Sequence, residues 1–306
     1  MQIRYGVSDQ SIDVSDICHR VLLKNGVIII PSGDVNRAAY FSDPLPGRLK
    51  SIFVISSSGT TTEYPHTTPL YINPAIEEVS TAISLGGLTD PNARLNYIHS
   101  MLRIKHGSFN EEFPEQMMAT KYLTGKERVL EIGGNIGRNS LVIGYILAQN
   151  NNNDFVSLES DSGIAAQLIE NRDLNRLTFK VENSALSSRK LIQKGWDTIP
   201  SDVLLSGYKS VNTVSYRELI DKYNIIFDTL VLDCEGAFYY ILMDMPEVLE
   251  NVNLIIMEND YHDINHKNTV DAILQKNNFA VDYREAGGWG PCQSKFFEVW
   301  KKQRLD

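Results

Sequence analysis

One ten-residue segment constrains this chain more than any other: residues 128–137 read R-V-L-E-I-G-G-N-I-G. An aliphatic run ends in the acidic residue Glu131, and the chain then turns through glycines into residues 139–148, which have a helical pattern. Glycine adopts positive φ without steric cost and lets the backbone approach a neighbour closely. A strand, a glycine turn and a helix in this order predict a nucleoside-binding turn at the edge of an open α/β sheet.

The spacing of the glycines narrows the choice of nucleoside. Dinucleotide loops read G-x-G-x-x-G and point helix N–H groups at a pyrophosphate. This loop reads G-x-x-x-G instead, and Glu131 stands where a pyrophosphate would be repelled. The pattern therefore disfavours a NAD-linked dehydrogenase, and its candidate contacts to a different nucleoside are Gly133, Gly134, Asn135 and Gly137.

Composition and charge limit the kinds of molecule that this chain is expected to bind. The chain has 306 residues, enough for a large core, and a net charge of −9, which argues against a broad nucleic-acid surface because phosphate binding needs clustered Lys and Arg. Its three cysteines are far apart, which is typical of reduced thiols. The first residues have no signal-peptide pattern, and no apolar run approaches membrane-spanning length. These features predict a cytoplasmic protein without a membrane partner.

The pattern of apolar and turn residues divides the chain into three parts. Residues 1–72 predict a small β-rich accessory domain, with strands at 27–30 and 51–55 and a helix over 13–24. Its aromatic residues are mostly core in a domain of this kind, but they are also candidates for a carbohydrate-stacking surface. This set consists of Tyr40, Phe41, Tyr64, His66 and Tyr71.

Residues 73–125 have the pattern of connecting helices that lead into the larger domain. Asn73-Pro74 is typical of a helix start, and Gly86-Gly87 of its end, with apolar positions at Ile76, Val79, Ala82 and Ile83 between them. Two more helices are predicted over 91–104 and 114–123.

Residues 126–306 alternate between apolar runs and helical segments. Five such runs predict parallel strands, because strands that alternate with helices form a sheet covered on both faces. Residues 279–284 and 295–301 are two further strand-like runs with no room for a crossover helix, so we expect them to be antiparallel neighbours. The five parallel runs are 128–132, 154–158, 178–182, 227–232 and 253–257.

The carboxyl ends of these strands carry the polar residues that a ligand site needs, since open α/β sheets bind ligands at that rim. Glu159 ends the second run and is placed to accept hydrogen bonds from ribose hydroxyls, with Ser160 beside it. Ser184 and Ala185 follow the third run and are placed to flank an adenine ring. The fourth and fifth runs end in acids and a histidine, namely Asp233, Glu235, Glu258 and His262.

A family resemblance emerges from these strand ends taken together. The segment L-V-L-D-C-E-G-A-F resembles the I-D-V-E-G-A-E signature of FkbM-type S-adenosylmethionine-dependent methyltransferases, and V-L-E-I-G-G-N-I-G resembles that family's D-V-G-A-N-x-G. L-E-S-D followed by E-N-R-D-L-N resembles F-E-P-x followed by N-x-x-x-N. The chain departs from the family at Ser160, at 215–217 and at Phe238. The resemblance covers residues 100 to 300 or so and implies the class I methyltransferase sheet, mostly parallel with an antiparallel last strand.

The resemblance also implies an activity. It predicts methyl transfer from S-adenosylmethionine to a hydroxyl of a saccharide or glycan acceptor, with Glu131, Glu159 and Asp233 among the cofactor-binding residues. Aligning the acceptor supplies ~7 kcal/mol or more, and a general base adds a smaller factor. The candidates for the catalytic groups are Asp233, Glu258 and His262. A less favoured alternative is that Asp233 and Glu258 hold Mg²⁺, which would acidify a diol of the acceptor.

Three other readings stay open at this stage. One is an RNA ribose or cap methyltransferase, although the segments 233–238 and 258–262 contain no lysine. Another is a non-catalytic methyltransferase fold that serves as a binding module. The third is the dehydrogenase that the glycine spacing disfavours. The accessory domain is expected either to recognise the acceptor or to mediate self-association into a homo-oligomer.

Overall fold

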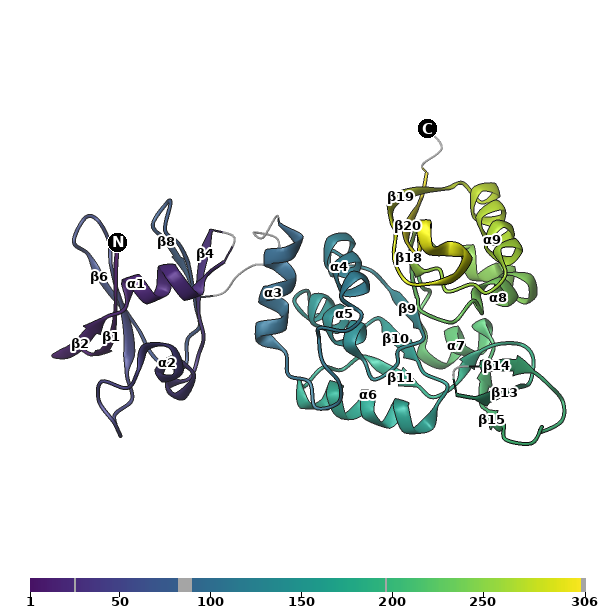
Figure 1. Cartoon of the computed structure of the whole chain (residues 1–306), viewed down its shortest axis with the longest axis horizontal. Coiled ribbons are helices and arrows are strands. Elements are labelled where there is room, and N and C mark those ends of the chain that lie inside the picture. Colours follow the sequence, from purple (N-terminus) through teal and green to yellow (C-terminus); the bar gives the residue numbers. More distant parts are fainter. Residues whose placement is uncertain (25, 82–89, 196, 304–306) are drawn as a thin grey trace. The chain divides into compact units, whose positions relative to one another are not determined.

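The computed structural model describes residues 1–24, 26–81, 90–195 and 197–303, and it contains two units, Met1–Ala93 and Arg94–Asp306 (Figure 1). In the first unit, two four-stranded antiparallel sheets surround a core that includes Tyr5, Ile28, Phe41 and Ile52. One sheet has the strand order β2 (Gln10–Asp13), β1 (Gln2–Val7), β5 (Ser51–Ile55), β6 (Thr61–Tyr64). The other has the order β3 (Leu23–Lys24), β4 (Val27–Ile30), β7 (Leu70–Asn73), β8 (Glu78–Ser80).

Two short helical regions complete the first unit. The helix α1 (Ser15–Ile17) continues as a π-helical segment (Cys18–Leu22), and together they occupy most of the helix predicted over 13–24. The helix α2 (Asp34–Phe41) follows β4. Phe41 and Tyr71 are buried in this unit, so the prediction that they belong to a carbohydrate-stacking surface is wrong. Tyr40 is exposed.

The helix predicted to begin at Asn73-Pro74 is wrong. Residues 70–80 form the antiparallel pair β7 and β8, with Ile72 opposite Val79 across the ladder. Pairing with β4 gives Ile72 a buried position that the local sequence does not reveal. Ile76 lies in the turn after β7 and Val79 lies in β8, so their spacing does not belong to a helix. The first unit accordingly extends beyond the boundary predicted at 72. Ala82, Ile83 and Gly86-Gly87 lie outside the described residues.

A seven-stranded sheet is the framework of the second unit. Its strand order is β11-β10-β9-β17-β18-β20-β19, parallel from β11 to β18, with β20 antiparallel to both of its neighbours. This is the mostly parallel sheet with an antiparallel last strand that the sequence predicts. The strands are β9 (Val129–Ile132), β10 (Phe155–Leu158), β11 (Lys180–Glu182), β17 (Thr229–Leu232), β18 (Leu254–Glu258), β19 (Phe279–Glu285) and β20 (Phe297–Lys302).

Helices cover both faces of this sheet. In Figure 1, α4 and α5 lie to one side of the strands β9 and β18, and α8 and α9 lie to the other. Leu130 and Ile132 of β9 share a buried cluster with residues of α7, α8 and α9, whereas Glu131 hydrogen-bonds to Ser140 of α5 on the opposite face. The helices are α3 (Pro91–Met101), α4 (Phe113–Tyr122), α5 (Arg138–Ala148), α6 (Ser162–Leu174), α7 (Tyr216–Tyr223), α8 (Phe238–Asp244) and α9 (Ile264–Lys276).

Between β11 and α7 the chain forms an additional small sheet that the sequence did not predict. It contains β14 (Asp197–Pro200), β13 (Leu191–Lys194) and β15 (Lys209–Val211), all antiparallel. The flanking strands β12 (Ala185–Leu186) and β16 (Thr213–Val214) pair with each other and bring the chain back to the main sheet. We call β13, β14 and β15 the insertion sheet.

Two departures from the family pattern have structural explanations. Ser215 is the N-cap of α7 and forms a reciprocal capping box with Glu218, which supplies a polar helix start at this position. Phe238 begins α8 with a side chain that is 1% exposed in the core. Among the described residues, no helix has both the length and the apolar character required to cross a bilayer.

Candidate active site

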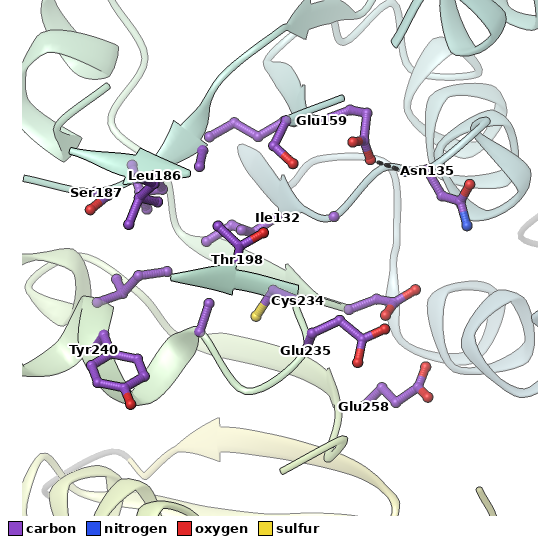
Figure 2. A pocket seen from close by; sticks show the side chains of 18 of the residues that line it. Ile132, Asn135, Glu159, Leu186, Ser187, Thr198, Cys234, Glu235, Tyr240 and Glu258 are labelled. Atoms are coloured by element: carbon purple, nitrogen blue, oxygen red, sulfur yellow. Dashed lines mark hydrogen bonds between the residues drawn. The ribbon is translucent and has the colours of Figure 1, made fainter. Parts of the chain in front are cut away.

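A cavity of about 1000 Å³ opens at the carboxyl ends of the parallel strands. Residues after β9, β10, β17 and β18 form one wall, and the start of α4 contributes a second. The insertion sheet, α8 and residues 184–187, 288 and 296–297 also line the cavity. In Figure 2, Asn135, Glu235 and Glu258 lie on one side of this cavity, and Leu186, Ser187 and Tyr240 on the other. The predicted residues that line it are Gly133, Asn135, Glu159, Ser160, Ser184, Ala185, Asp233, Glu258 and His262.

The glycines of the first loop are needed mainly for packing inside the protein. Gly133 has φ +93°, and a Cβ there would lie 1.6 Å from the backbone oxygen of Asp233. A Cβ on Gly134 would lie 2.1 Å from the hydroxyl of Ser157. The loop therefore packs directly on β17 and β10. Gly134 and Gly137 are not among the residues that line the cavity, and their contact with a cofactor stays a prediction.

Glu131 lies beneath this loop rather than in the cavity wall. Its carboxylate is 2% exposed and accepts hydrogen bonds from the hydroxyls of Ser140 and Ser157, the latter at 2.6 Å. Burial raises the pKa of Glu131 to about 7, partly offset by these two hydrogen bonds. Glu131 therefore ties β9 to α5 and β10, and its contact with a cofactor stays a prediction.

Glu159 is the acid that reaches the cavity from β10. Its two carboxylate oxygens accept backbone hydrogen bonds from Asn135, at 3.0 Å, and from Asp161, at 2.7 Å (Figure 2). The side chain is 7% exposed, and burial raises its pKa. Because each carboxylate oxygen has more than one acceptor site, Glu159 still has capacity for ligand hydroxyls.

Asn135 connects this acid to the start of α4. Its side-chain amide donates to the carboxylate of Glu112 at 3.1 Å, and Arg138 donates to the same carboxylate oxygen at 2.6 Å. Asn135 has φ +46°, a conformation that asparagine tolerates better than most residues. Glu112 lines the cavity but is neutralised by Arg138.

Three carboxyl groups meet where α4, β17 and β18 come together: Glu115, Asp233 and Glu258. We call them the acidic trio. Burial, a hydrogen bond with Glu115 and the charge of Asp233 raise the pKa of Glu258 to about 11. Burial, followed by the charges of Asp260 and Glu112, raises the pKa of Asp233 well above its ordinary value. Burial and neighbouring like charges thus disfavour the ionised forms of Asp233 and Glu258.

Asp260 supports the turn that follows β17. Its carboxylate accepts hydrogen bonds from the backbone N–H groups of Glu235 and Gly236, the latter at 2.8 Å. Burial and the charge of Glu235 raise the pKa of Asp260 to about 7. This turn places Glu235 at φ +50° with an exposed side chain.

His262 lies at the exposed edge of the cavity. Its ring is 4.6 Å from the ring of Trp289, and its proximity partly offsets the rise that burial causes in the pKa of Glu235. The structure thus places all three predicted catalytic candidates, Asp233, Glu258 and His262, in one cavity wall. Among the described residues, no group of three or more His, Cys, Asp or Glu side chains has an arrangement that would hold a metal ion.

Sequence reasoning missed the residues that reach the cavity from elsewhere in the chain. Glu112 directly precedes α4, and Glu115 lies in the first turn of this helix, which carries no motif. Gln193 belongs to the insertion sheet. Gln193 is 6% exposed and donates to Ser160 at 3.2 Å, while its own carbonyl oxygen has no partner among the residues that the structure describes. Arg189 pairs with Asp244 at another part of the wall. The helix α4 itself was predicted over 114–123, but nothing in that segment indicated that its first turn lines a cavity.

No protein-family model matches the chain, and no curated protein matches it either, so the FkbM-type resemblance stays a prediction from the sequence. Solved structures do show similarity. An O-methyltransferase from Bacillus cereus in complex with SAH is 13% identical, with a TM-score of 0.38 over 69% of this chain and 88% of that one.

Two other solved structures show a comparable level of similarity. A ribosomal protein methylase from Lactobacillus delbrueckii is 10% identical, with a TM-score of 0.41 over 65% of this chain and 82% of that one. A tRNA methyltransferase from B. subtilis is 14% identical, with a TM-score of 0.39 over 62% and 65%. Sequence identities this low give no information about which molecule accepts a methyl group.

Proposed function

We propose that this protein is an S-adenosylmethionine-dependent O-methyltransferase that methylates a hydroxyl of a sugar or glycan. One observation supports this cofactor: the three neighbouring strands β10, β9 and β17 are followed by an acid placed for a ribose, by the glycine loop and by Asp233, all around one cavity. The sugar acceptor rests on the FkbM-type resemblance of the sequence.

The residues present fit this cofactor in both shape and charge. Ser184 and Ala185 after β11 are placed for the adenine, Glu159 for the ribose, and Gly133, Asn135 and Asp233 for the amino-acid end. S-adenosylmethionine supplies a methyl group on a positively charged sulfonium. The acidic trio has no cationic partner among the described residues, so a positively charged ligand relieves repulsion between its members.

Individual residues of the cavity then have distinct roles. Glu258, with its raised pKa, holds its proton and acts as a hydrogen-bond donor. His262 is the candidate to receive the proton of the acceptor hydroxyl, because it is exposed in the wall beside the trio. The insertion sheet covers the opposite wall through Leu191, Gln193 and Thr198 and limits the size of the acceptor.

The charge of the cavity favours a neutral acceptor over a polyanion. Carboxyl groups of Glu115, Asp233, Glu235 and Glu258 line it, while Arg138 and Arg189 are already paired with acids. Phosphate groups would be repelled by this wall. Because a tRNA methyltransferase is among the similar folds, RNA belongs in the acceptor test.

Two measurements test the proposal. Calorimetry with S-adenosylhomocysteine should show binding to the full chain, and its absence would refute the cofactor assignment. Isotope-labelled S-adenosylmethionine should then label a neutral glycan, detected by mass spectrometry, and leave capped or transfer RNA unlabelled. Labelling of RNA alone would keep the cofactor but overturn the acceptor.

A further inference from the structure

We propose that the acceptor is a pyranose sugar that stacks the C–H face of its ring on the indole of Trp289 and hydrogen-bonds through its hydroxyls to Glu235. This inference rests on the proposed function and deepens it, because it names the residues that receive the acceptor. The sequence pattern assigned neither residue to the acceptor.

The connection between β19 and β20, residues 286–296, lies at the rim of the sheet where the cavity opens. The strand β20 is antiparallel to both of its neighbours, so β19 runs parallel to β18 and ends at the same edge. Gly288 and Phe296 of this connection line the cavity, together with Phe297 of β20. Trp289 therefore adjoins a residue of the cavity wall.

Trp289 is exposed, although its side chain is large and mostly apolar. It is 43% exposed, whereas Trp300, the other tryptophan that the structure describes, is 1% exposed. A single exposed aromatic side chain is common on protein surfaces. What matters is therefore how Trp289 is held and what surrounds it.

The connection holds Trp289 at the rim through a fixed backbone. Gly288 has φ +50°, and a Cβ there would lie 2.1 Å from the ring of Phe296. The N–H of Gly287 donates to the carbonyl oxygen of Gln293 at 2.9 Å, which closes the connection on itself. Only glycine combines this positive φ with so close an approach. The backbone thus presents the indole outward instead of burying it.

The indole lies beside His262, which lines the cavity. The two ring centroids are 4.6 Å apart, and the ring planes are inclined by 51°, so the rings are not stacked face to face. Together with the exposure of Trp289, this inclination leaves indole surface open to a ligand. One face of a pyranose carries C–H groups and packs on an aromatic ring, while its hydroxyls point outward and need polar partners.

Glu235 supplies such a polar partner next to the same histidine. Its side chain is exposed and lines the cavity, and it lies close enough to His262 for an electrostatic interaction. Its backbone has φ +50°, an uncommon conformation for glutamate, and its N–H is held by the carboxylate of Asp260. A carboxylate accepts strong hydrogen bonds on two oxygens, which suits two adjacent sugar hydroxyls.

The charge of this edge favours a sugar over a nucleobase. A base of RNA would stack on an indole equally well. Glu235 and Glu258, however, lie on the same side of the cavity (Figure 2), and their carboxylates would repel the phosphates that accompany a base. A neutral pyranose offers a stacking face and hydroxyl donors without a phosphate.

Saturation-transfer NMR on the full chain, with S-adenosylhomocysteine present, tests this site. The probes are the methyl glycosides of glucose, galactose, mannose and rhamnose at millimolar concentration. We expect binding of at least one of them, with the strongest transfer to the C–H protons of one ring face. This pattern is measured on the wild type, so the inference stays testable even if a variant fails to fold.

Variants then locate the contact. Trp289→Leu should weaken binding of the glycoside about tenfold, and Trp289→Phe, which keeps an aromatic face, about threefold or less. Glu235→Gln should weaken it about fivefold, because an amide offers one neutral acceptor oxygen. Affinity for S-adenosylhomocysteine, measured by calorimetry, should stay unchanged in all three.

Tyr40→Leu is the comparison variant. Tyr40 is an aromatic residue of similar exposure in the first unit and is absent from the residues that line the cavity. Its replacement should leave binding of the glycoside unchanged. A loss in Tyr40→Leu, with Trp289→Leu unaffected, would overturn the inference and move the stacking surface to the first unit.

Each other contrary outcome has a distinct meaning. Wild-type affinity in Trp289→Leu, or equal transfer to both ring faces, would overturn the inference and leave the proposed function intact. Failure of all the glycosides to bind, with uridine monophosphate binding through Trp289 instead, would overturn it in favour of a nucleobase. Absence of S-adenosylhomocysteine binding would refute the proposed function, while the glycoside measurement would still decide this inference.

Discussion

The carboxylate of Glu159 accepts a hydrogen bond of 3.0 Å from the backbone N–H of Asn135, and so the acid at the end of β10 is tied to the glycine loop after β9 (Figure 2). The second carboxylate oxygen is held by the backbone N–H of Asp161. The acid is thus fixed in the cavity before any ligand arrives. Such preorganisation reduces the entropy that binding costs.

Replacing this acid should weaken cofactor binding. We expect Glu159→Ala to lower the affinity for S-adenosylhomocysteine by about tenfold or more, because ribose hydroxyls lose a charged acceptor and the loop loses its anchor. Calorimetry measures the loss. Asp173→Ala serves as a control, since its side chain is exposed and pairs with Arg172. Equal affinities of Glu159→Ala and the wild type would contradict the ribose assignment.

Gly133→Ala should destabilise the second unit strongly. A Cβ there collides with the backbone oxygen of Asp233 at 1.6 Å, in a segment with φ +93°. We expect a loss of about 3 kcal/mol or more in the free energy of unfolding. Gly207→Ala also has positive φ, but its nearest neighbours are flexible Lys194 atoms at 3.7 Å, so about 1 kcal/mol is expected. Similar urea midpoints for the two variants would show that the close approach is unimportant.

The buried acid Glu131 should make stability depend on pH. Its pKa is raised from 4.5 to about 7 in the folded protein, so the folded state holds this proton more tightly than the unfolded state. Stability from this group is complete below pH 4.5 and is lost as the pH rises through about 7. The advantage of Glu131→Gln over the wild type should therefore grow by about 3 kcal/mol between pH 4.5 and pH 8.

Urea unfolding at several pH values measures this difference. The contribution of Asp260, whose pKa is also raised, cancels because it is present in both proteins. A constant difference across the pH range would mean that Glu131 titrates near its ordinary pKa.

His262 should affect turnover more than cofactor binding. If it receives the proton of the acceptor, His262→Gln should lower kcat by about a hundredfold and leave the affinity for S-adenosylhomocysteine unchanged. Steady-state kinetics with the labelled glycan provides the measurement. Trp289→Leu tests whether the neighbouring ring positions His262, and it should give a smaller decrease. Unchanged kcat in His262→Gln would leave His262 as a surface residue beside Trp289.

The local sequence predicted the main sheet well, because its strands are short apolar runs between clear turn residues. The runs at 128–132, 154–158 and 227–232 correspond to β9, β10 and β17 within two residues. The antiparallel pairing of β19 and β20 followed from the short connection between them. Residues 73–80 were misread, because their apolar spacing is compatible with a helix but they form a turn and the strand β8. This strand pairs with β7, whose other neighbour is the distant strand β4.

For the candidate site too, some residues were predictable from the local sequence and others were not. Glu159, Asp233 and Glu258 were predictable because each ends an apolar run, and parallel strands place their carboxyl ends at one rim. In the sequence, Glu131 looked equivalent to these three acids. The alternation of side chains along β9 turns it to the opposite face from Ile132, where Ser140 and Ser157 bind it.

The sequence by itself determined which residues end the strands, since periodicity and turn chemistry are local properties of the chain. Only the tertiary structure decided that Glu115 of α4 and Gln193 of the insertion sheet reach the same cavity. Their positions depend on how separate elements pack, and no local pattern encodes a contact between Glu115 and Glu258, 143 positions apart. The strand ends thus supply one wall of the site, and packing supplies the rest.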